Sequence, residues 1–277
     1  MEDFDAFARL ITALRPWLGQ LVVVGGWAHR LHRFHPLANP PARLPLRTRD
    51  ADLAFSTDAA FAGNLRTALA EAGFGEELFG DDTPPATHYC LGVGEEDAGF
   101  YAEFLTPLHG SGVKRSGASD ATVSKAGVTA QKVRYLELLL VAPWSLRVGP
   151  KLGVPVLSDM DVRVPNPTSF IVQKLLIHSD RPGGKRAQDV LYINDTLELF
   201  GASLDELHRL WVDQGRAGMS AKTAKRAETI ARELFADVSD TIREAALMQQ
   251  DRRLTPENLR VACEYGLEQI LGAPEYR

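Results

Sequence analysis

The hydrophobic pattern of the chain changes at Pro165, and this change limits the possible fold more than any other feature. Before Pro165, short apolar runs of strand type alternate with helical segments. From Asn166 onward, every segment has helical spacing, and Asn166-Pro167 itself is a helix-start signal. We therefore predict an α+β domain over residues 1–165, with a mixed sheet flanked by helices, and an all-helical domain over residues 166–277.

Apolar spacing and the turn residues locate the elements more closely. The expected helices cover residues 4–18, 27–34, 59–72, 170–177, 188–200, 203–214, 221–249 and 256–271. The expected strands cover residues 21–24, 48–55, 88–93, 100–105, 131–141, 154–157 and 161–164. The third and fourth of these are expected to form a pair around a turn at residues 94–97. Residues 35–46 hold four prolines, which predicts a loop.

Composition excludes several classes of protein. A chain of 277 residues that is 45% hydrophobic can bury a sizeable core, and its net charge of -5 argues against non-specific coating of nucleic acid. The first residues carry acids where a signal peptide carries bases, and the longest apolar stretches are too short to span a bilayer. Cys90 and Cys263 lack cysteine neighbours and are expected to be buried thiols. We expect a cytoplasmic protein that has no membrane partner.

Two features of the N-terminal part point to phosphate and metal chemistry. Gly25-Gly26 follows an apolar strand and opens a helix, where backbone N–H groups and the helix dipole favour a phosphate. Asp50 and Asp52 alternate on one strand, so their side chains share one face at backbone positions roughly 6–7 Å apart. Their mutual repulsion is on the order of 2–3 kcal/mol at an effective dielectric near 20. A magnesium ion between them would remove this cost, although two solvated acids on an edge strand are the plain alternative.

Glu103 is an acid within a second apolar strand. If that strand neighbours the first, Glu103 supplies a third carboxylate, which could complete a metal site and assist deprotonation of an attacking hydroxyl.

Together these residues resemble the DNA polymerase β-like nucleotidyltransferase superfamily. The matching motifs are Val24-Gly25-Gly26-Trp27-Ala28, then Arg47-Thr48-Arg49-Asp50-Ala51-Asp52-Leu53, then Glu103-Phe104-Leu105. The residues of these motifs are most similar to those of the minimal bacterial branch that includes the AbiEii-type toxins. Two departures are the long loop between Gly26 and Asp50 and a third acid that is Glu rather than Asp.

The resemblance also covers part of the helical domain. Lys174, Arg181, Lys185 and Asp189 are similar to a pattern that those proteins carry on helices. It implies that Lys174 reaches the triphosphate, that Asp189 and Lys185 line the same cleft, and that the helical domain completes this cleft. Expected nucleotide-binding residues are thus Gly25, Gly26, Arg49, Lys174, Lys185 and Asp189.

We accordingly predict a nucleotidyltransferase that uses Mg²⁺ or Mn²⁺, held by Asp50, Asp52 and Glu103. It would move a nucleoside monophosphate from a nucleoside triphosphate to an acceptor hydroxyl. The resemblance implies an RNA or tRNA end or a protein side chain as the acceptor, and a toxin role would imply an antitoxin protein as partner. Arg43, Arg47 and Arg49 favour RNA. A small-molecule nucleotidyltransferase and a catalytically inactive nucleotide-binding protein stay open as alternatives.

Overall fold

The computed structural model describes residues 3–79, 86–92, 99–113, 117, 119–248 and 253–272. The chain divides into two compact units. The first comprises residues 1–34 and 47–165, and the second comprises residues 35–46 and 166–277. The proline-rich segment 35–46, which lies within the predicted N-terminal domain of residues 1–165, groups with the helical unit.

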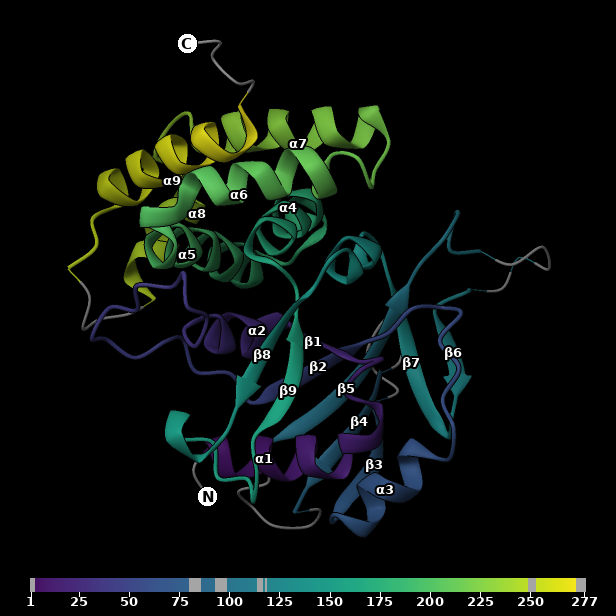
Figure 1. Ribbon diagram of the computed structural model, residues 1–277. Coiled ribbons are helices and arrows are strands. Elements are labelled where there is room, and N and C mark those ends of the chain that lie inside the picture. Colours follow the sequence, from purple (N-terminus) through teal and green to yellow (C-terminus); the bar gives the residue numbers. More distant parts are fainter. Residues whose placement is uncertain are drawn as a thin grey trace. The chain divides into compact units, whose positions relative to one another are not determined.

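The first unit is built on a seven-stranded mixed sheet (Figure 1). The main path runs in the order β1-β2-β5-β4-β3, and β7 pairs with β5 and carries β6. The pairs β2–β5 and β5–β7 are parallel, whereas the others are antiparallel. The strands are β1 (Val22–Val24), β2 (Asp50–Ala54), β3 (Phe74–Phe79), β4 (Ala86–Leu91), β5 (Tyr101–Pro107), β6 (Thr122–Lys125) and β7 (Val128–Val133).

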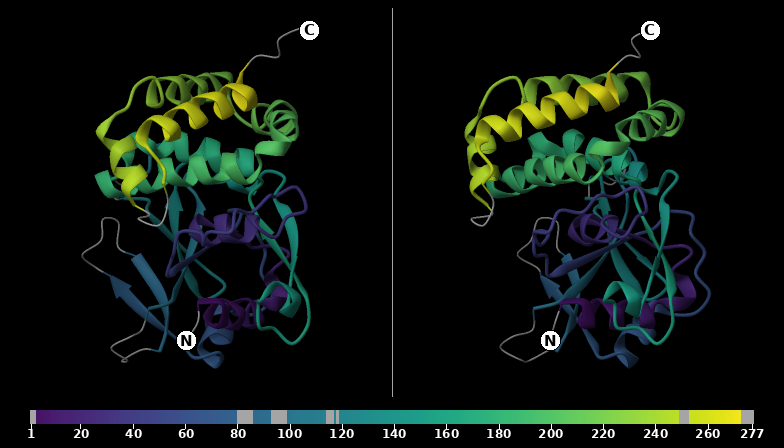
Figure 2. Two further views of the ribbon diagram at one scale, coloured as in Figure 1. Left: turned by 90° about the vertical axis from the view of Figure 1, so that its left-hand side faces the viewer. Right: turned by 60° about the vertical axis from the view of Figure 1, so that its left-hand side comes forward.

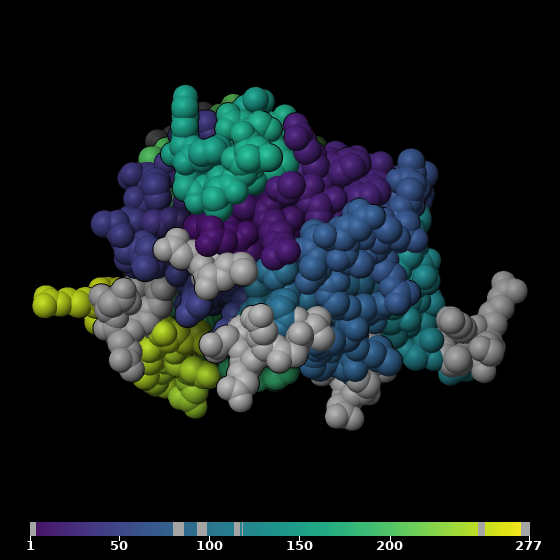
Figure 3. Space-filling model, turned by 90° about the horizontal axis from the view of Figure 1, so that it is seen from below, coloured from purple at the N-terminus to yellow at the C-terminus, as the bar shows by residue number. Residues whose placement is uncertain are grey.

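Helices and a hairpin complete this unit. Figure 1 shows α1 (Asp3–Ala13) and α3 (Leu65–Glu71) on one side of the sheet. Seen from below in Figure 3, the purple residues of the N-terminus and the blue residues of the α3 and β3 region lie next to each other at the surface. The helix α2 (Gly25–His32) follows β1 directly, and β8 (Trp144–Val148) and β9 (Met160–Val164) form a separate two-stranded sheet.

The two faces of the large sheet differ at the β2–β5 pair. On one face Ala51, Leu53, Ala102 and Phe104 are buried in the core. The other face is apolar at one end, where Val22, Val24, Ala54 and Leu105 pack against Leu136 and Leu139. Toward the start of β2 and β5, that same face carries acids instead. The sheet therefore offers a polar patch beside its second core cluster.

The second unit is helical. In Figure 2, α9 (yellow) runs alongside the green helices, and it contacts α6, α7 and α8. The α-helices are α4 (Pro167–Ile177), α5 (Gly183–Leu199), α6 (Leu204–Leu210), α7 (Ala221–Leu234), α8 (Asp240–Leu247) and α9 (Pro256–Leu271), with a π-helical turn at Trp211–Gly215. In the described residues, no strand follows Val164. The predicted α+β class with a helical C-terminal part is confirmed.

Several predicted elements are wrong in detail. The helix predicted over residues 59–72 begins at Leu65, because the Asn64 side chain caps it by accepting from Thr67 N at 3.0 Å. The strand predicted over 131–141 ends at Val133, and Leu136–Leu140 is a 3₁₀ helix. Residues 154–157 form no strand. The strands β3, β6 and β8 were not predicted, and the predicted turn at 94–97 lies outside the described residues.

Two further expectations, on membrane-spanning segments and on the two cysteines, can be compared with the structure. No helix in the described part of the chain combines the length and apolar character needed to cross a bilayer. Cys90 and Cys263 are both buried free thiols, as expected. Burial raises the pKa of Cys90 to about 11, with smaller contributions from Glu77.

Candidate active site

The two acids of β2 lie on the polar patch of the sheet. Asp50 and Asp52 are half-buried, whereas Ala51 and Leu53 between and after them are fully buried. This alternation follows from the two-residue period of a strand. The Thr48 hydroxyl donates a hydrogen bond to the Asp50 carboxylate. The Asp50 side chain is thus oriented by its own strand before any ligand is considered.

The third acid lies on the neighbouring strand. β2 and β5 pair in parallel, with Asp52 opposite Glu103 and Asp50 opposite Tyr101. Residues paired in this way point to the same face, on strands about 4.8 Å apart. The condition set by the sequence analysis, that the two acidic strands be neighbours, is met.

The start of α2 contacts Asp52. β1 and β2 pair antiparallel with Val24 opposite Asp52, and α2 begins at the next residue, Gly25. Gly25 has a φ of +62°, and a Cβ atom on it would overlap the Asp52 carboxylate, whose Cγ would lie 3.1 Å away. Val24 has no side-chain oxygen that could cap the helix. The first N–H groups of α2, which could bind a phosphate, therefore lie beside the Asp52 carboxylate, which could hold a cation.

His88 is a site residue that the sequence analysis missed. It lies on β4, and its Nε2 is 2.6 Å from Oε1 of Glu103. Its ring stacks on Tyr101, with centroids 4.2 Å apart and planes 15° apart, and it also contacts Phe79. The β4–β5 register pairs Tyr89 with Ala102, so one step further sets His88 opposite Glu103. Counting residues outward in both directions from the predicted turn at 94–97 pairs His88 with Glu103, so this signal was present in the sequence.

The acids also affect Tyr101. Burial is the main reason that the pKa of its phenol is raised far above the ordinary value, and the charges of Asp50, Glu103 and Asp52 raise it further, in that order. The Tyr101 phenol therefore stays protonated at neutral pH, as a neutral ring at the edge of the acidic patch.

The donors fit a magnesium-type cation in chemistry but only partly in arrangement. Asp50, Asp52 and Glu103 offer carboxylate oxygens, which are the ligands that Mg²⁺ and Mn²⁺ prefer. Within the described part of the chain, however, no three His, Cys, Asp or Glu side chains are grouped to hold a metal ion. Mg²⁺ commonly takes only one or two protein carboxylates together with substrate phosphates. Asp50 and Asp52 suffice for such a site, and Glu103 is oriented by His88.

The other predicted residues of this unit have different environments. Gly26 is buried within α2. Arg49 is exposed, and its carbonyl accepts a hydrogen bond from Tyr101 N at 3.2 Å. This main-chain bond helps to set the register of β2 and β5.

In the helical unit the structure brings Lys174 and Asp189 together. The Lys174 ammonium donates to the Asp189 carboxylate, which also accepts from Arg181 Nε at 3.2 Å. Lys174 and Asp189 are both buried, and the ammonium lies 4.7 Å from the centre of the Tyr192 ring and 5.0 Å from that of Phe170. A buried charge that is paired in this way is costly to separate from its partner.

Two other basic residues of the helical unit, Lys185 and Arg43, have different surroundings. Lys185 is exposed at the beginning of α5. Arg43 binds Glu198, with 2.7 Å between Nη1 and Oε1, and it also contacts Asp195 at 3.4 Å. The pKa of Arg43 is raised above its ordinary value, chiefly by the hydrogen bond to Glu198. Arg43 is thus engaged by two acids, so the predicted contribution of Arg43 to RNA binding is weakened.

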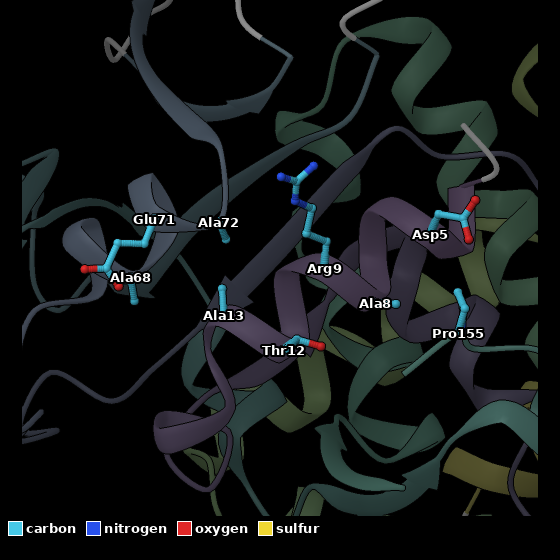
Figure 4. A pocket seen from close by; sticks show the side chains of 9 residues that line it. All are labelled: Asp5, Ala8, Arg9, Thr12, Ala13, Ala68, Glu71, Ala72 and Pro155. Atoms are coloured by element: carbon cyan, nitrogen blue, oxygen red, sulfur yellow. The ribbon is translucent and has the colours of Figure 1, made fainter. Parts of the chain in front are cut away.

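The first unit also has a pocket of about 670 Å³, which lies away from the acids of β2 and β5 (Figure 4). Its walls come mainly from α1 and α3, with Arg9, Asp5 and Glu71 as its charged residues. None of Asp50, Asp52 and Glu103 lines it. We therefore locate the candidate active site by side-chain chemistry and strand register rather than by this pocket.

The mixed sheet, the glycine-led helix against Asp52 and the facing acids of β2 and β5 together define a nucleotidyltransferase-type fold. A family model described as Nucleotidyltransferase matches residues 2–214, which is most of the chain. The chain belongs to this nucleotidyltransferase family. Comparisons with curated proteins and with solved structures gave no match. Family membership supports the transfer of a nucleoside monophosphate in general, and it supports a nucleotidyltransferase superfamily.

Proposed function

We propose that the protein is a metal-dependent nucleotidyltransferase that moves a nucleoside monophosphate from a nucleoside triphosphate to an acceptor hydroxyl. The observation that carries the proposal is the position of Asp52, which lies against Gly25 at the start of α2 and opposite Glu103 on β5. This arrangement supports a phosphate at the N–H groups of α2 and a cation at the carboxylates of β2.

Each residue of the patch has a distinct task in this proposal. Asp50 and Asp52 would hold Mg²⁺ or Mn²⁺, which when bound would neutralise the charge of the phosphates. Gly25 and Gly26 would bring main-chain N–H groups to the triphosphate. Glu103 would complete the set and accept a hydrogen bond from the acceptor hydroxyl, the proton of which must leave as the new ester bond forms. Pyrophosphate is the leaving group.

The residues of the helical unit enter the proposal through the family resemblance. Lys174 and Asp189 are ion-paired with each other. Their predicted role at the triphosphate, together with that of the exposed Lys185, stays a prediction. The corresponding variant is Lys174→Met, which should lower transfer without lowering metal affinity if this role is correct.

For the acceptor we propose an RNA end such as that of a tRNA. The supporting observation is that Arg47 and Arg49, directly before β2, are both exposed. Replacing both by Gln should weaken RNA binding and make it less sensitive to salt, because fewer phosphate charges are neutralised. RNA binding that does not change with salt, or that is unaffected by the replacement, would eliminate this acceptor.

The resemblance to AbiEii-type proteins supports a toxin role with an antitoxin as partner. Expression of the intact protein should then arrest bacterial growth, whereas expression of the Asp52→Asn variant should not. Equal growth with both proteins would argue against this role.

The test of the function uses purified protein, Mg²⁺ or Mn²⁺, each labelled nucleoside triphosphate and total RNA. Asp50→Asn/Asp52→Asn should abolish transfer of the label, by at least about 1,000-fold, because the cation loses both carboxylates. Asp161→Asn, at an exposed position of β9, is the matched control and should behave like the unaltered protein. Equal transfer by the double variant would refute the mechanism.

The same assay separates the proposal from its alternatives. Label that appears on protein or on a small hydroxylated molecule would keep the reaction and change the acceptor. Nucleotide binding without release of pyrophosphate, whatever acceptor is supplied, would favour a binding protein on this fold, an alternative that the sequence leaves open because its third acid is Glu103 rather than Asp.

A further inference from the structure

The contact between His88 and Glu103 brings a histidine to the acidic patch from a third strand. Nε2 of His88 lies 2.6 Å from Oε1 of Glu103, and the two side chains are only 11% and 20% exposed. Since little water reaches this contact, the hydrogen bond to the carboxylate is stronger than a comparable bond at the surface.

The imidazole of His88 is itself held between two rings. Tyr101 on β5 stacks on one side at 4.2 Å, and Phe79 on β3 lies at 4.2 Å with its plane tilted by 34°. Tyr101 is in turn the register partner of Asp50. Three neighbouring strands therefore determine where the Nε2 atom lies, which makes His88 a more rigid partner than a histidine on a loop.

The position of Glu103 makes such a partner necessary. Glu103 is the register neighbour of Asp52, and Asp50 lies two residues earlier on the same face. Like charges at strand spacing repel each other, so an unrestrained glutamate would turn away from the two aspartates. The bond between His88 Nε2 and Glu103 Oε1 therefore limits how far the Glu103 carboxylate can turn from Asp52.

We propose that His88 is a positioning residue of the transfer reaction, which acts by fixing the Glu103 carboxylate beside Asp52 for its role toward the cation and the acceptor. This inference rests on the proposed function. Partners of metal-binding carboxylates commonly matter by 10- to 100-fold in affinity or activity, which gives the expected scale.

The test compares four proteins in a double-mutant cycle: the unaltered chain, His88→Leu, Glu103→Gln and the double variant. Two quantities are measured, the affinity for Mn²⁺ by electron paramagnetic resonance in the presence of a non-hydrolysable nucleoside triphosphate, and kcat/KM for transfer. His88→Leu should lower each by about tenfold or more. In the Glu103→Gln background it should have almost no further effect, because the carboxylate that His88 positions is gone.

Two further variants separate positioning from packing. His88→Gln keeps an N–H donor near the Nε2 position and should restore a large part of both losses. Phe79→Leu removes one ring contact but leaves the hydrogen bond to Glu103, and it should cost much less than His88→Leu. Thermal unfolding of each variant identifies any protein that fails to fold. If His88→Leu fails to fold, the comparison of His88→Gln with Phe79→Leu decides between positioning and packing.

The outcomes are distinguishable from a failure of the proposed function. Absence of transfer by the unaltered protein would refute the function, while the Mn²⁺ affinities would still test His88. Two results would overturn the inference and leave His88 a packing residue. One is that His88→Leu causes a loss of equal size with Glu103 intact and in the Glu103→Gln background. The other is that His88→Leu leaves the Mn²⁺ affinity unchanged.

Discussion

Gly25 shows how one residue can determine the geometry of the site. It has a positive φ, and a Cβ atom on it would overlap the Asp52 carboxylate, which would then have to shift. The Gly-Gly pair was expected to bring main-chain N–H groups to a phosphate. The structure adds that the first glycine also makes room for the acid, which a reading of the helix start by itself does not reveal.

Gly25→Ala should therefore reduce transfer by at least about tenfold and destabilise the protein by about 1–3 kcal/mol, since it adds backbone strain to a clash. Urea unfolding and the labelled-nucleotide assay measure the two effects. Gly19→Ala is the control, because nothing lies within 4 Å of its added Cβ. Equal behaviour of the two variants would show that Asp52 can move without consequence.

A second prediction at this scale concerns Tyr89. Its hydroxyl accepts from Thr129 N at 3.0 Å, and burial is the main reason that its pKa is raised to about 12. Because the folded-state pKa lies above the ordinary value of about 10, the protonated phenol stabilises the fold below pH 10. This stabilisation is lost as the pH rises from about 10 toward 12.

Tyr89→Phe should cost about 1–2 kcal/mol at neutral pH, because the partly buried Thr129 N–H loses its acceptor. Its stability should then fall less steeply than that of the unaltered protein between about pH 10 and 12. Urea unfolding at several pH values measures this difference, and absorbance at 295 nm should show one fewer tyrosine titrating near pH 12. Parallel stability curves would contradict the raised pKa.

At the scale of elements, capping residues were the most reliable signals. The helix predicted over residues 256–271 has these bounds in α9, where the Thr255 side chain caps the helix and Pro256 is its first residue. Segments without such signals were misplaced. The run from Leu136 to Leu140 looked like a strand because short apolar runs have no period that distinguishes a strand from a buried helical turn. It became a 3₁₀ helix that covers the apolar end of the sheet face.

Thr255→Ala should destabilise the helical unit by about 1 kcal/mol, because Asn258 N loses its side-chain acceptor at 3.1 Å. Thr255→Ser keeps the hydroxyl and should stay within about 0.5 kcal/mol of the unaltered protein. Urea unfolding followed by circular dichroism gives both values. A loss of similar size in the serine variant would mean that the methyl group, not the cap, stabilises α9.

At the scale of the whole molecule, the chain leaves its first unit after Phe34 and returns to it at Arg47. The intervening segment is attached to the helical unit by Asn39 N, which donates to Leu199 O at 2.8 Å, and by Arg43 with its two acids. Contacts between segments so far apart in the sequence cannot be inferred from local spacing. A proline-rich loop was all that the pattern could indicate.

Arg43→Gln should release this segment. Since the side chain of Asp195 is only 6% exposed, loss of its partner should destabilise the helical unit by about 1–3 kcal/mol. Cleavage within residues 35–46 by a protease should become several-fold faster. Arg209→Gln, which breaks an exposed pair with Glu206, is the control and should change stability by less than about 0.5 kcal/mol. Equal cleavage rates in both variants would contradict the anchoring role.

Local sequence determined the class of fold, the glycine-led helix and the alternation that sets Asp50 and Asp52 on one face. These features depend on residues close together in the chain, where period and capping act directly. Only the tertiary structure decided that Glu103 lies opposite Asp52, that His88 holds it, and that Arg43 belongs to the helical unit. Such contacts depend on strand order and register, which are set by the packing of the entire sheet and by contacts between distant segments.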